Sequence, residues 1–215
     1  PSQQAQSPDQ TRAPQPAKLA QIKRQVIADD LPQVWSLEFL SGGCMLVTLK
    51  EGAMRIVDSE GQPGPDIAGV PKVAARGQGG LLDVALAPDF KTSSRIFFSF
   101  SESRDGGNGT SVAAARLVTN DDGGGSLENL TVIFRQTPTY DGDKHFGSRL
   151  VFAPDGKLFI TTGDRGKRDE AQNLGVHLGK LIRINSDGGI PEDNPFVGTD
   201  DARREVWSYG HRNIQ

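Results

Sequence analysis

Short apolar runs of strand length alternate with clusters of Gly, Asp, Asn and Pro from Val26 onward. Runs of this length between turn residues are typical of β-strands, and no amphipathic helix of roughly 10–15 residues separates them. Three stretches share a pattern of strand, tight turn and strand, and a further candidate strand follows each of them. The stretches are residues 36–50, 83–101 and 149–164, and the strands that follow them are 53–58, 111–118 and 179–185.

The three stretches recur at a spacing that fits the blades of a β-propeller. The spacing is 47 residues from Leu37 to Val84 and 66 residues from Val84 to Leu150. Propeller blades are typically ~40–50 residues long, with insertions in their loops. The longer interval contains two glycine-rich stretches, 105–109 and 121–126, which we expect to be loops. We therefore predict an all-β propeller, over the alternative of a β-sandwich with coincidental hairpins.

The chain holds too few repeats to close a propeller ring. Three repeats lie between residues 31 and 215, whereas a propeller typically needs about 4–8 blades. Residues 205–215 look like an outer strand and the loop that leads into a fourth repeat. We expect residues 26–215 to be a partial propeller within a longer protein. A leader rich in Pro and Gln, expected to be disordered, precedes it over residues 1–25.

Charge and composition exclude several classes of protein. The 24 Lys and Arg residues nearly balance the 27 Asp and Glu residues, and the net charge of −3 offers no basic field for a nucleic acid. No apolar run approaches the roughly 20 residues of a membrane-spanning helix. The single cysteine excludes an internal disulfide and a four-cysteine zinc site.

His145 is the best placed of the three histidines for catalysis. It precedes one predicted strand, and Asp164 follows the next. Because two antiparallel strands joined by a tight turn return the chain to the same edge, we expect the two side chains to lie close together. A carboxylate beside an imidazole fixes its tautomer and raises its basicity, which makes a general-base pair. The plainer alternatives are a solvated loop histidine and an aspartate that serves only its own turn.

Arg212, Asn213 and Gln78 are further candidates for a binding site. Arg212 and Asn213 come from a loop one repeat after His145 and could face the same axis, where a planar cation suits a carboxylate or quinone oxygen. Gln78 precedes the second repeat and could bind a sugar hydroxyl. The alternatives are a surface salt bridge for Arg212 and an ordinary loop amide for Gln78. Clustered carboxylates in residues 186–196 are compatible with a Ca²⁺ site. Their Asp-Gly-Gly and Asn-Pro sequences are more typical of turns, so no metal ligand is assigned.

Four stretches, in order along the chain, carry a family resemblance. They are GQGGLLDVALAPDF (77–90), HFGSRLVFAPDGKLFITTGDRG (145–166), LGKLIRINSDGGIPEDNPF (178–196) and EVWSYGHRN (205–213). Together they resemble the soluble PQQ-dependent aldose sugar dehydrogenases, the glucose/sorbosone dehydrogenase family. That family has a six-bladed β-propeller, so the resemblance implies that this chain covers about the first half of one.

The resemblance also implies roles for the candidate residues. His145 would be the general base that takes the proton of the sugar C1 hydroxyl while a hydride passes to PQQ, and Asp164 would orient it. Arg212 would polarise the quinone and contact the substrate, with Asn213 beside it at the cofactor. Gln78 and His145 would contact the sugar. Ca²⁺ would be a second cofactor, and its ligands and the remaining PQQ-binding residues would lie beyond Gln215.

We therefore expect a periplasmic or secreted quinoprotein oxidoreductase that oxidises aldoses to lactones and passes electrons to an external acceptor. Two alternatives remain open. A Ca²⁺-dependent lactonase on a similar propeller would need a carboxylate-rich central metal site, whereas His, Gln, Arg and Asn stand at the inner loop ends here. A non-enzymatic binding module is the other alternative, because propellers host many unrelated functions.

Overall fold

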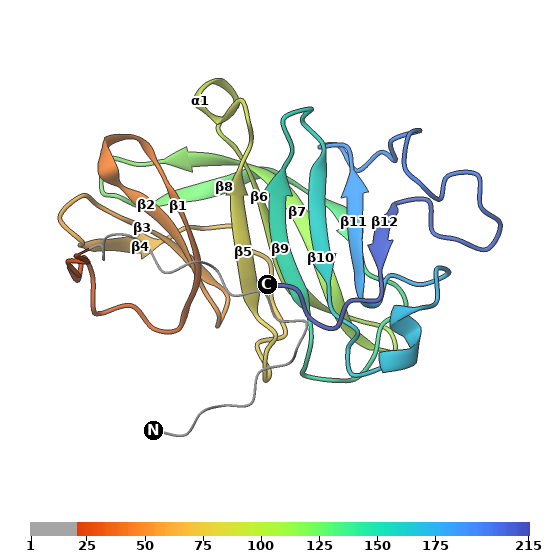
Figure 1. Cartoon of the computed structure of the whole chain (residues 1–215). Coiled ribbons are helices and arrows are strands. Elements are labelled where there is room, and N and C mark those ends of the chain that lie inside the picture. Colours follow the sequence, from red (N-terminus) through yellow and green to blue (C-terminus); the bar gives the residue numbers. More distant parts are fainter. Residues whose placement is uncertain (1–20) are drawn as a thin grey trace.

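The computed structural model describes residues 21–215, which form three antiparallel sheets of four consecutive strands each (Figure 1). We call these sheets blades 1, 2 and 3. Blade 1 contains β1 (Val34–Phe39), β2 (Met45–Leu49), β3 (Ala53–Val57) and β4 (Pro63–Asp66). Blade 2 contains β5 (Leu81–Leu86), β6 (Arg95–Arg104), β7 (Gly107–Thr119) and β8 (Gly125–Arg135). Blade 3 contains β9 (Gly147–Phe152), β10 (Leu158–Thr162), β11 (Lys180–Ile184) and β12 (Val206–Tyr209). The helices are short: η1 (Ser41–Gly43), α1 (Phe90–Ser93) and η2 (Arg168–Ala171).

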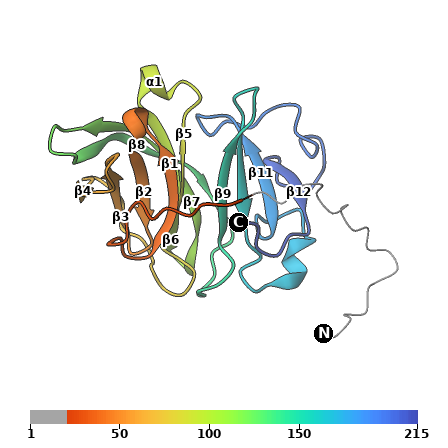
Figure 2. The same ribbon diagram turned by 60° about the vertical axis from the view of Figure 1, so that its left-hand side comes forward.

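The first strands of the three blades, β1, β5 and β9, lie next to one another, and the later strands lie further out (Figures 1 and 2). This is the arrangement of neighbouring propeller blades. The prediction of an all-β fold with successive antiparallel sheets is confirmed, and the sandwich alternative is wrong because three sheets follow one another. Residues 206–209 form the outer strand of blade 3, as expected.

Two connections differ from the sequence-based expectation. The turn after β5 is the short helix α1 rather than a tight turn, since no glycine follows Asp89 and the chain reverses only at Ser94, whose φ is +53°. The stretches 105–109 and 121–126 are parts of hairpins that join long strands, not free loops. The fourth strands β4 and β8 were not predicted, because β4 is a four-residue edge strand with two prolines and β8 has no regular alternation of polar and apolar residues.

Blade 2 is buried on both of its faces, which explains the mostly apolar run from Ile96 to Phe100 in β6. Side chains alternate across a strand, so Phe98 and Phe100 pack into the core shared with blade 1, whereas Phe97 packs into the core shared with blade 3. The outer faces of blades 1 and 3 are more open. Phe39 on blade 1 is 69% exposed and Trp207 on blade 3 is 40% exposed.

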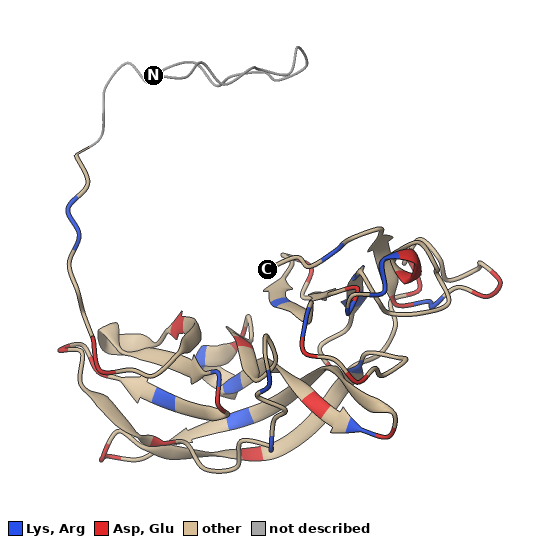
Figure 3. Ribbon diagram, turned by 90° about the horizontal axis from the view of Figure 1, so that it is seen from below, with Lys and Arg blue, Asp and Glu red and all other residues tan. Residues whose placement is uncertain are grey.

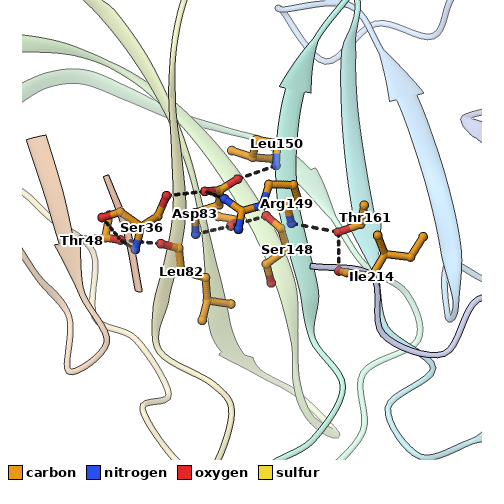
Figure 4. A network of polar contacts seen from close by, with 10 residues as sticks. Ser36, Thr48, Leu82, Asp83, Ser148, Arg149, Leu150, Thr161 and Ile214 are labelled. Atoms are coloured by element: carbon orange, nitrogen blue, oxygen red, sulfur yellow. Dashed lines mark hydrogen bonds and ion pairs between the residues drawn. The ribbon is translucent and has the colours of Figure 1, made fainter. Parts of the chain in front are cut away.

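A polar network joins the three blades where their first strands meet (Figure 4). The buried carboxylate of Asp83 on β5 accepts hydrogen bonds from Ser36 Oγ on β1 at 2.6 Å and from Arg149 NH1 on β9 at 2.7 Å. It also accepts the backbone N–H of Leu150 at 2.7 Å. Burial raises the pKa of Asp83, although these hydrogen bonds oppose the effect. One carboxylate therefore links all three blades.

Basic and acidic residues are interspersed over the three blades (Figure 3), in keeping with the near-balanced charge. Among residues 21–215, no helix is long and apolar enough to cross a membrane. The disordered leader was predicted over residues 1–25, of which 1–20 lie outside the described residues. Residues 21–25 are exposed and belong to no helix or strand.

Candidate active site

His145 and Asp164 meet at the end of the β9–β10 hairpin, and the expectation that they lie close together is confirmed. The hairpin pairs Gly147 with Thr162, so the residues two positions beyond each partner face one another. His145 Nδ1 lies 2.6 Å from Asp164 Oδ1, and both side chains are largely buried. The Pro-Asp-Gly turn closes the other end of this hairpin, where Gly156 adopts a φ of +78° that favours glycine.

The close contact between the two loops depends on glycine. A Cβ on Gly163 would lie 1.8 Å from the carbonyl oxygen of His145, which no side chain could tolerate. His145 itself has a φ of +54°, in the left-handed region that non-glycine residues rarely adopt. Strained backbone of this kind persists only where its surroundings fix it, and it concentrates at functional sites.

The hydrogen bonds around Asp164 define the protonation of the His145 ring. Asp164 Oδ1 also accepts the backbone N–H of Gly166 at 2.8 Å, so this oxygen serves as a hydrogen-bond acceptor. His145 Nδ1 must then carry the proton that it donates to Asp164, which leaves a lone pair on Nε2. Among residues 21–215, no protein group forms a hydrogen bond with Nε2. The ring is therefore prepared to accept a proton from a ligand.

The pair borders a cavity of about 750 Å³ that Arg212 also lines. The Arg212 side chain is exposed, and its backbone carbonyl accepts the N–H of Asp164 at 2.9 Å. The structure therefore brings His145, Asp164 and Arg212 together, as the sequence predicted, although their chemical roles remain predictions.

Asn213 and Gln78 support the backbone around this cavity. Asn213 Oδ1 accepts the N–H of Gly147 at 2.9 Å. Gln78 Oε1 accepts the N–H of His145 at 2.7 Å, and the Gln78 N–H donates to the carbonyl of Asp143 at 2.7 Å. Both residues lie where the sequence placed them, and both use their side-chain oxygen to hold the loop that carries His145.

The sequence analysis missed several residues that line the cavity. They come from the segment around η2 and from the turn after β12: Gly166, Arg168, Asp169, Ala171, Gln172, Gly210 and His211. His211 is one of the three histidines of the chain, and the sequence analysis assigned it no role. Burial and the nearby Lys180 lower its pKa, which favours the neutral ring. The segment around η2 shows no periodicity or motif, so nothing in the sequence placed it beside His145.

Lys180 lies buried behind the cavity wall. Its Nζ donates to the carbonyls of Leu178 at 2.6 Å and of Glu170 and Ala171, both at 3.0 Å. Burial lowers the pKa of Lys180 to about 8. The ammonium group therefore holds the C-terminal part of η2 against β11.

His177 serves the structure and does not line the cavity. Its Nδ1 accepts the backbone N–H of Thr137 at 3.0 Å, so Nε2 carries the proton and donates to Glu205 at 2.5 Å. In the carboxylate-rich stretch 186–196, Asp193 binds the guanidinium of Arg183 at 2.8 Å and 3.2 Å. Among residues 21–215, no group of three or more His, Cys, Asp or Glu side chains could hold a metal ion.

Comparison with known proteins identifies the family. Residues 31–215 match the family described as Glucose / Sorbosone dehydrogenase, and the chain belongs to it. It is 44% identical over 198 residues to the aldose sugar dehydrogenase YliI of Escherichia coli K12, covering 91% of this chain and 53% of that protein.

Solved structures of aldose sugar dehydrogenases share the fold. The soluble enzyme of Escherichia coli in its apo form gives a TM-score of 0.83 at 44% identity, covering 88% of this chain and 54% of that chain. The PQQ-bound enzyme of Streptomyces coelicolor gives a TM-score of 0.73 at 30% identity, covering 89% and 54%. This chain therefore spans about half the length of the relatives that it matches.

Proposed function

We propose that this chain is the N-terminal part of a periplasmic or secreted quinoprotein that oxidises the C1 hydroxyl of aldoses to lactones. The observation that carries the proposal is the 2.6 Å contact between His145 Nδ1 and Asp164 Oδ1 at a cavity that Arg212 also lines. Family membership and the PQQ-bound relative support the class of reaction and the cofactor.

His145 is the general base of the proposed reaction. Its Nε2 accepts the proton of the sugar C1 hydroxyl, and the proton on Nδ1 stays on the ring and is shared with Asp164. The negative charge of Asp164 stabilises the imidazolium that forms. Because Asp164 is also fixed by the Gly166 N–H, the ring is oriented before the substrate arrives.

The cavity fits an anionic quinone of the size of PQQ. Its volume of about 750 Å³ lies within the roughly 300–1,000 Å³ of small-ligand sites. Arg212 and Arg168 both line it and are both exposed, so two guanidinium groups are available for carboxylate or quinone oxygens. Bound there, PQQ would supply the two-electron acceptor for the C1 hydride. Arg212 and Asn213 would hold the cofactor, and Gln78 would face the sugar with His145.

Calcium, unlike PQQ, finds no matching site in the described residues. The described residues contain no cluster of His, Cys, Asp or Glu side chains that could hold a metal ion, so they do not fit a calcium site built from such side chains. We place the Ca²⁺ ligands outside residues 21–215, and no step assigned to this chain uses the ion.

We further propose that the complete fold is a six-bladed propeller. Phe39 and Trp207 stand exposed on the two outer blade faces, where a next blade would cover them. The relatives are about twice as long as this chain, which leaves room for three more blades.

Reconstitution of the full-length protein tests the proposed function. The cofactor-free protein is assayed for dye-linked oxidation of aldoses with PQQ and Ca²⁺ together, with each alone and with neither. We expect oxidation only with both. Oxidation without PQQ, or none with both, would refute the proposal. Hydrolysis of sugar lactones with Ca²⁺ alone would instead identify a lactonase.

A further inference from the structure

Arg165, the residue after Asp164, is buried beneath the loop that carries His145. Its Nε donates to the carbonyl of Lys144 at 2.9 Å, and its NH2 donates to the carbonyl of Gly142 at 2.8 Å. Two further bonds anchor it to Asn108, from NH1 to the backbone oxygen at 3.0 Å and from NH2 to Oδ1 at 2.6 Å. The guanidinium therefore ties the His145 loop to the start of β7.

Two neighbouring contacts join the turn after β10 to the loop before β9. Asp164 binds the side chain of His145, and Arg165 binds the backbone of Lys144. The guanidinium also lies 3.9 Å from the ring centre of Phe146, on the other side of His145 in the chain. Both sequence neighbours of His145 are thus held by one side chain, while His145 itself keeps its left-handed backbone.

Arg165 binds carbonyl and amide oxygens and forms no ion pair with a carboxylate in the described part of the chain. Among residues 21–215, no carboxylate lies within ion-pair distance of its guanidinium, and all four of its hydrogen bonds go to neutral oxygens. Burial lowers the pKa of Arg165 to about 10, so the group remains charged at pH 7. Asp143 and Arg76 are the charged groups that act on it, with opposite signs. Burying a charge without an anionic partner lowers the stability of the fold, and no salt bridge accounts for the burial of Arg165.

We propose that Arg165 is a positioning residue that holds the 142–146 loop so that His145 presents Nε2 to the substrate while Nδ1 stays on Asp164. This inference rests on the proposed function, because it assumes that His145 is the general base. It extends that function to a residue that touches neither substrate nor cofactor.

The variant Arg165→Lys in the full-length protein tests this proposal. Lysine keeps the positive charge but cannot reach Lys144, Gly142 and Asn108 together. Arg183→Lys is the matched control, because Arg183 is 5% exposed against 6% for Arg165 and likewise stacks on an aromatic ring, that of Trp207. It lies on β11 and does not line the cavity.

The first readout is the position of the His145 ring, which requires no activity. The Nδ1–H signal of His145 is observed by NMR of ¹⁵N-labelled imidazoles and assigned by its loss in His145→Gln. We expect this signal to shift and exchange faster in Arg165→Lys and to be unchanged in Arg183→Lys. The buried Nε2–H of His177 serves as an internal reference that neither variant should move.

The second readout separates orientation from binding. We expect kcat of Arg165→Lys to fall by about 10- to 100-fold, the effect of a misplaced reacting group, with KM nearly unchanged. The acid limb of the kcat–pH profile should move to lower pH, because a looser Asp164 contact stabilises the imidazolium less. Arg183→Lys should change thermal stability alone.

Asn108→Ala provides a second, milder variant should Arg165→Lys fail to fold. It removes Oδ1 as an acceptor for Arg165 and Nδ2 as a donor to the Gly142 carbonyl of the same loop, and it should change both readouts in the same direction, but less. An unmoved His145 signal in the folded variants, or a kcat profile equal to that of Arg183→Lys, would overturn the proposal. If wild-type protein fails to oxidise aldoses, the proposed function fails, and the NMR readout still decides whether Arg165 positions the ring.

Discussion

Asn213 accepts a hydrogen bond from the backbone N–H of Gly147 at 2.9 Å, although 66 residues separate the two along the chain. Gly147 opens β9 directly after the His145 loop, and Asn213 follows Arg212. The contact therefore fixes the segment after β12, the outer strand of blade 3, against the start of β9 beside the candidate active site. Thr161 extends this attachment by donating to the carbonyl of Ile214 at 3.0 Å (Figure 4).

We predict that replacement of Asn213 with Ala weakens cofactor binding more than it weakens the fold. The lost hydrogen bond contributes about 0.5–1.5 kcal/mol to stability, but the freed segment carries Arg212. The PQQ dissociation constant, measured by fluorescence titration of the full-length protein, should rise, while its thermal midpoint falls by only a few degrees. Asn120→Ala, in the exposed connection between β7 and β8 on blade 2, is the control and should alter neither. Unchanged PQQ affinity in Asn213→Ala would contradict the prediction.

His145→Gln should lower the rate of aldose oxidation by roughly two to four orders of magnitude, the usual contribution of a positioned general base. Glutamine is close to histidine in size, so the loop should keep its conformation, which circular dichroism and the thermal midpoint would check. His177→Gln is the comparison, since His177 lies outside the cavity and should affect stability rather than rate. A rate within a few-fold of wild type in His145→Gln would remove His145 from the mechanism.

Asp164→Asn should lower kcat by about 100-fold or more, because the amide can offer its N–H to Nδ1 and reverse the tautomer of the ring. The Michaelis constant should change little, since Asp164 binds His145 and the Gly166 backbone and not the sugar. Steady-state kinetics with several aldoses would measure both constants. A variant in which only the Michaelis constant rises would show that Asp164 acts in substrate binding.

Asp83 should make the stability of the protein depend on pH in a predictable direction. Burial raises the pKa of Asp83 in the folded protein, so the carboxyl keeps its proton to a higher pH when folded than when unfolded. Its contribution to the free energy of unfolding is therefore fully present below the unfolded pKa and declines as the pH rises through the folded pKa. The difference in unfolding free energy between wild type and Asp83→Asn should shrink over this range, measured by denaturant titration from roughly pH 3 to 7.

Glu38 is the group to control for in that experiment, because burial and Asp83 also raise its pKa. The measurement is repeated in a Glu38→Gln background. If the pH dependence then vanishes, Glu38 and not Asp83 was its source.

A protein consisting of residues 1–215 alone should be inactive and should associate. Phe39 and Trp207 lie on uncovered blade faces, and exposed apolar surface of this kind favours association. Light scattering would measure size, and dye-linked glucose oxidation with PQQ and Ca²⁺ would measure activity. A monodisperse monomer that oxidises sugar would show that three blades are self-sufficient.

The parts of the site that the sequence could predict are those that follow from hairpin geometry. The strand pattern and the Pro-Asp-Gly turn were enough to bring His145 to Asp164, because register fixes which residues share an edge. The fourth strands β4 and β8 were missed, since edge strands need no apolar pattern. The wall around η2 was missed because its position depends on Lys180 and on long-range backbone contacts, which leave no local signal. The sequence analysis assigned no role to Arg165, because its bonds to Asn108 join positions 57 residues apart and leave no local signal.

The two-sided burial of β6 has a consequence for experiments on assembly. Phe97 and Phe98 are adjacent in sequence but belong to different cores, one facing blade 3 and the other facing blade 1. Truncating either ring would loosen one inter-blade contact and leave the other intact. Substitutions at these two neighbouring residues can therefore distinguish the docking of blade 2 onto blade 1 from its docking onto blade 3. Each substitution should slow a different one of these two folding steps.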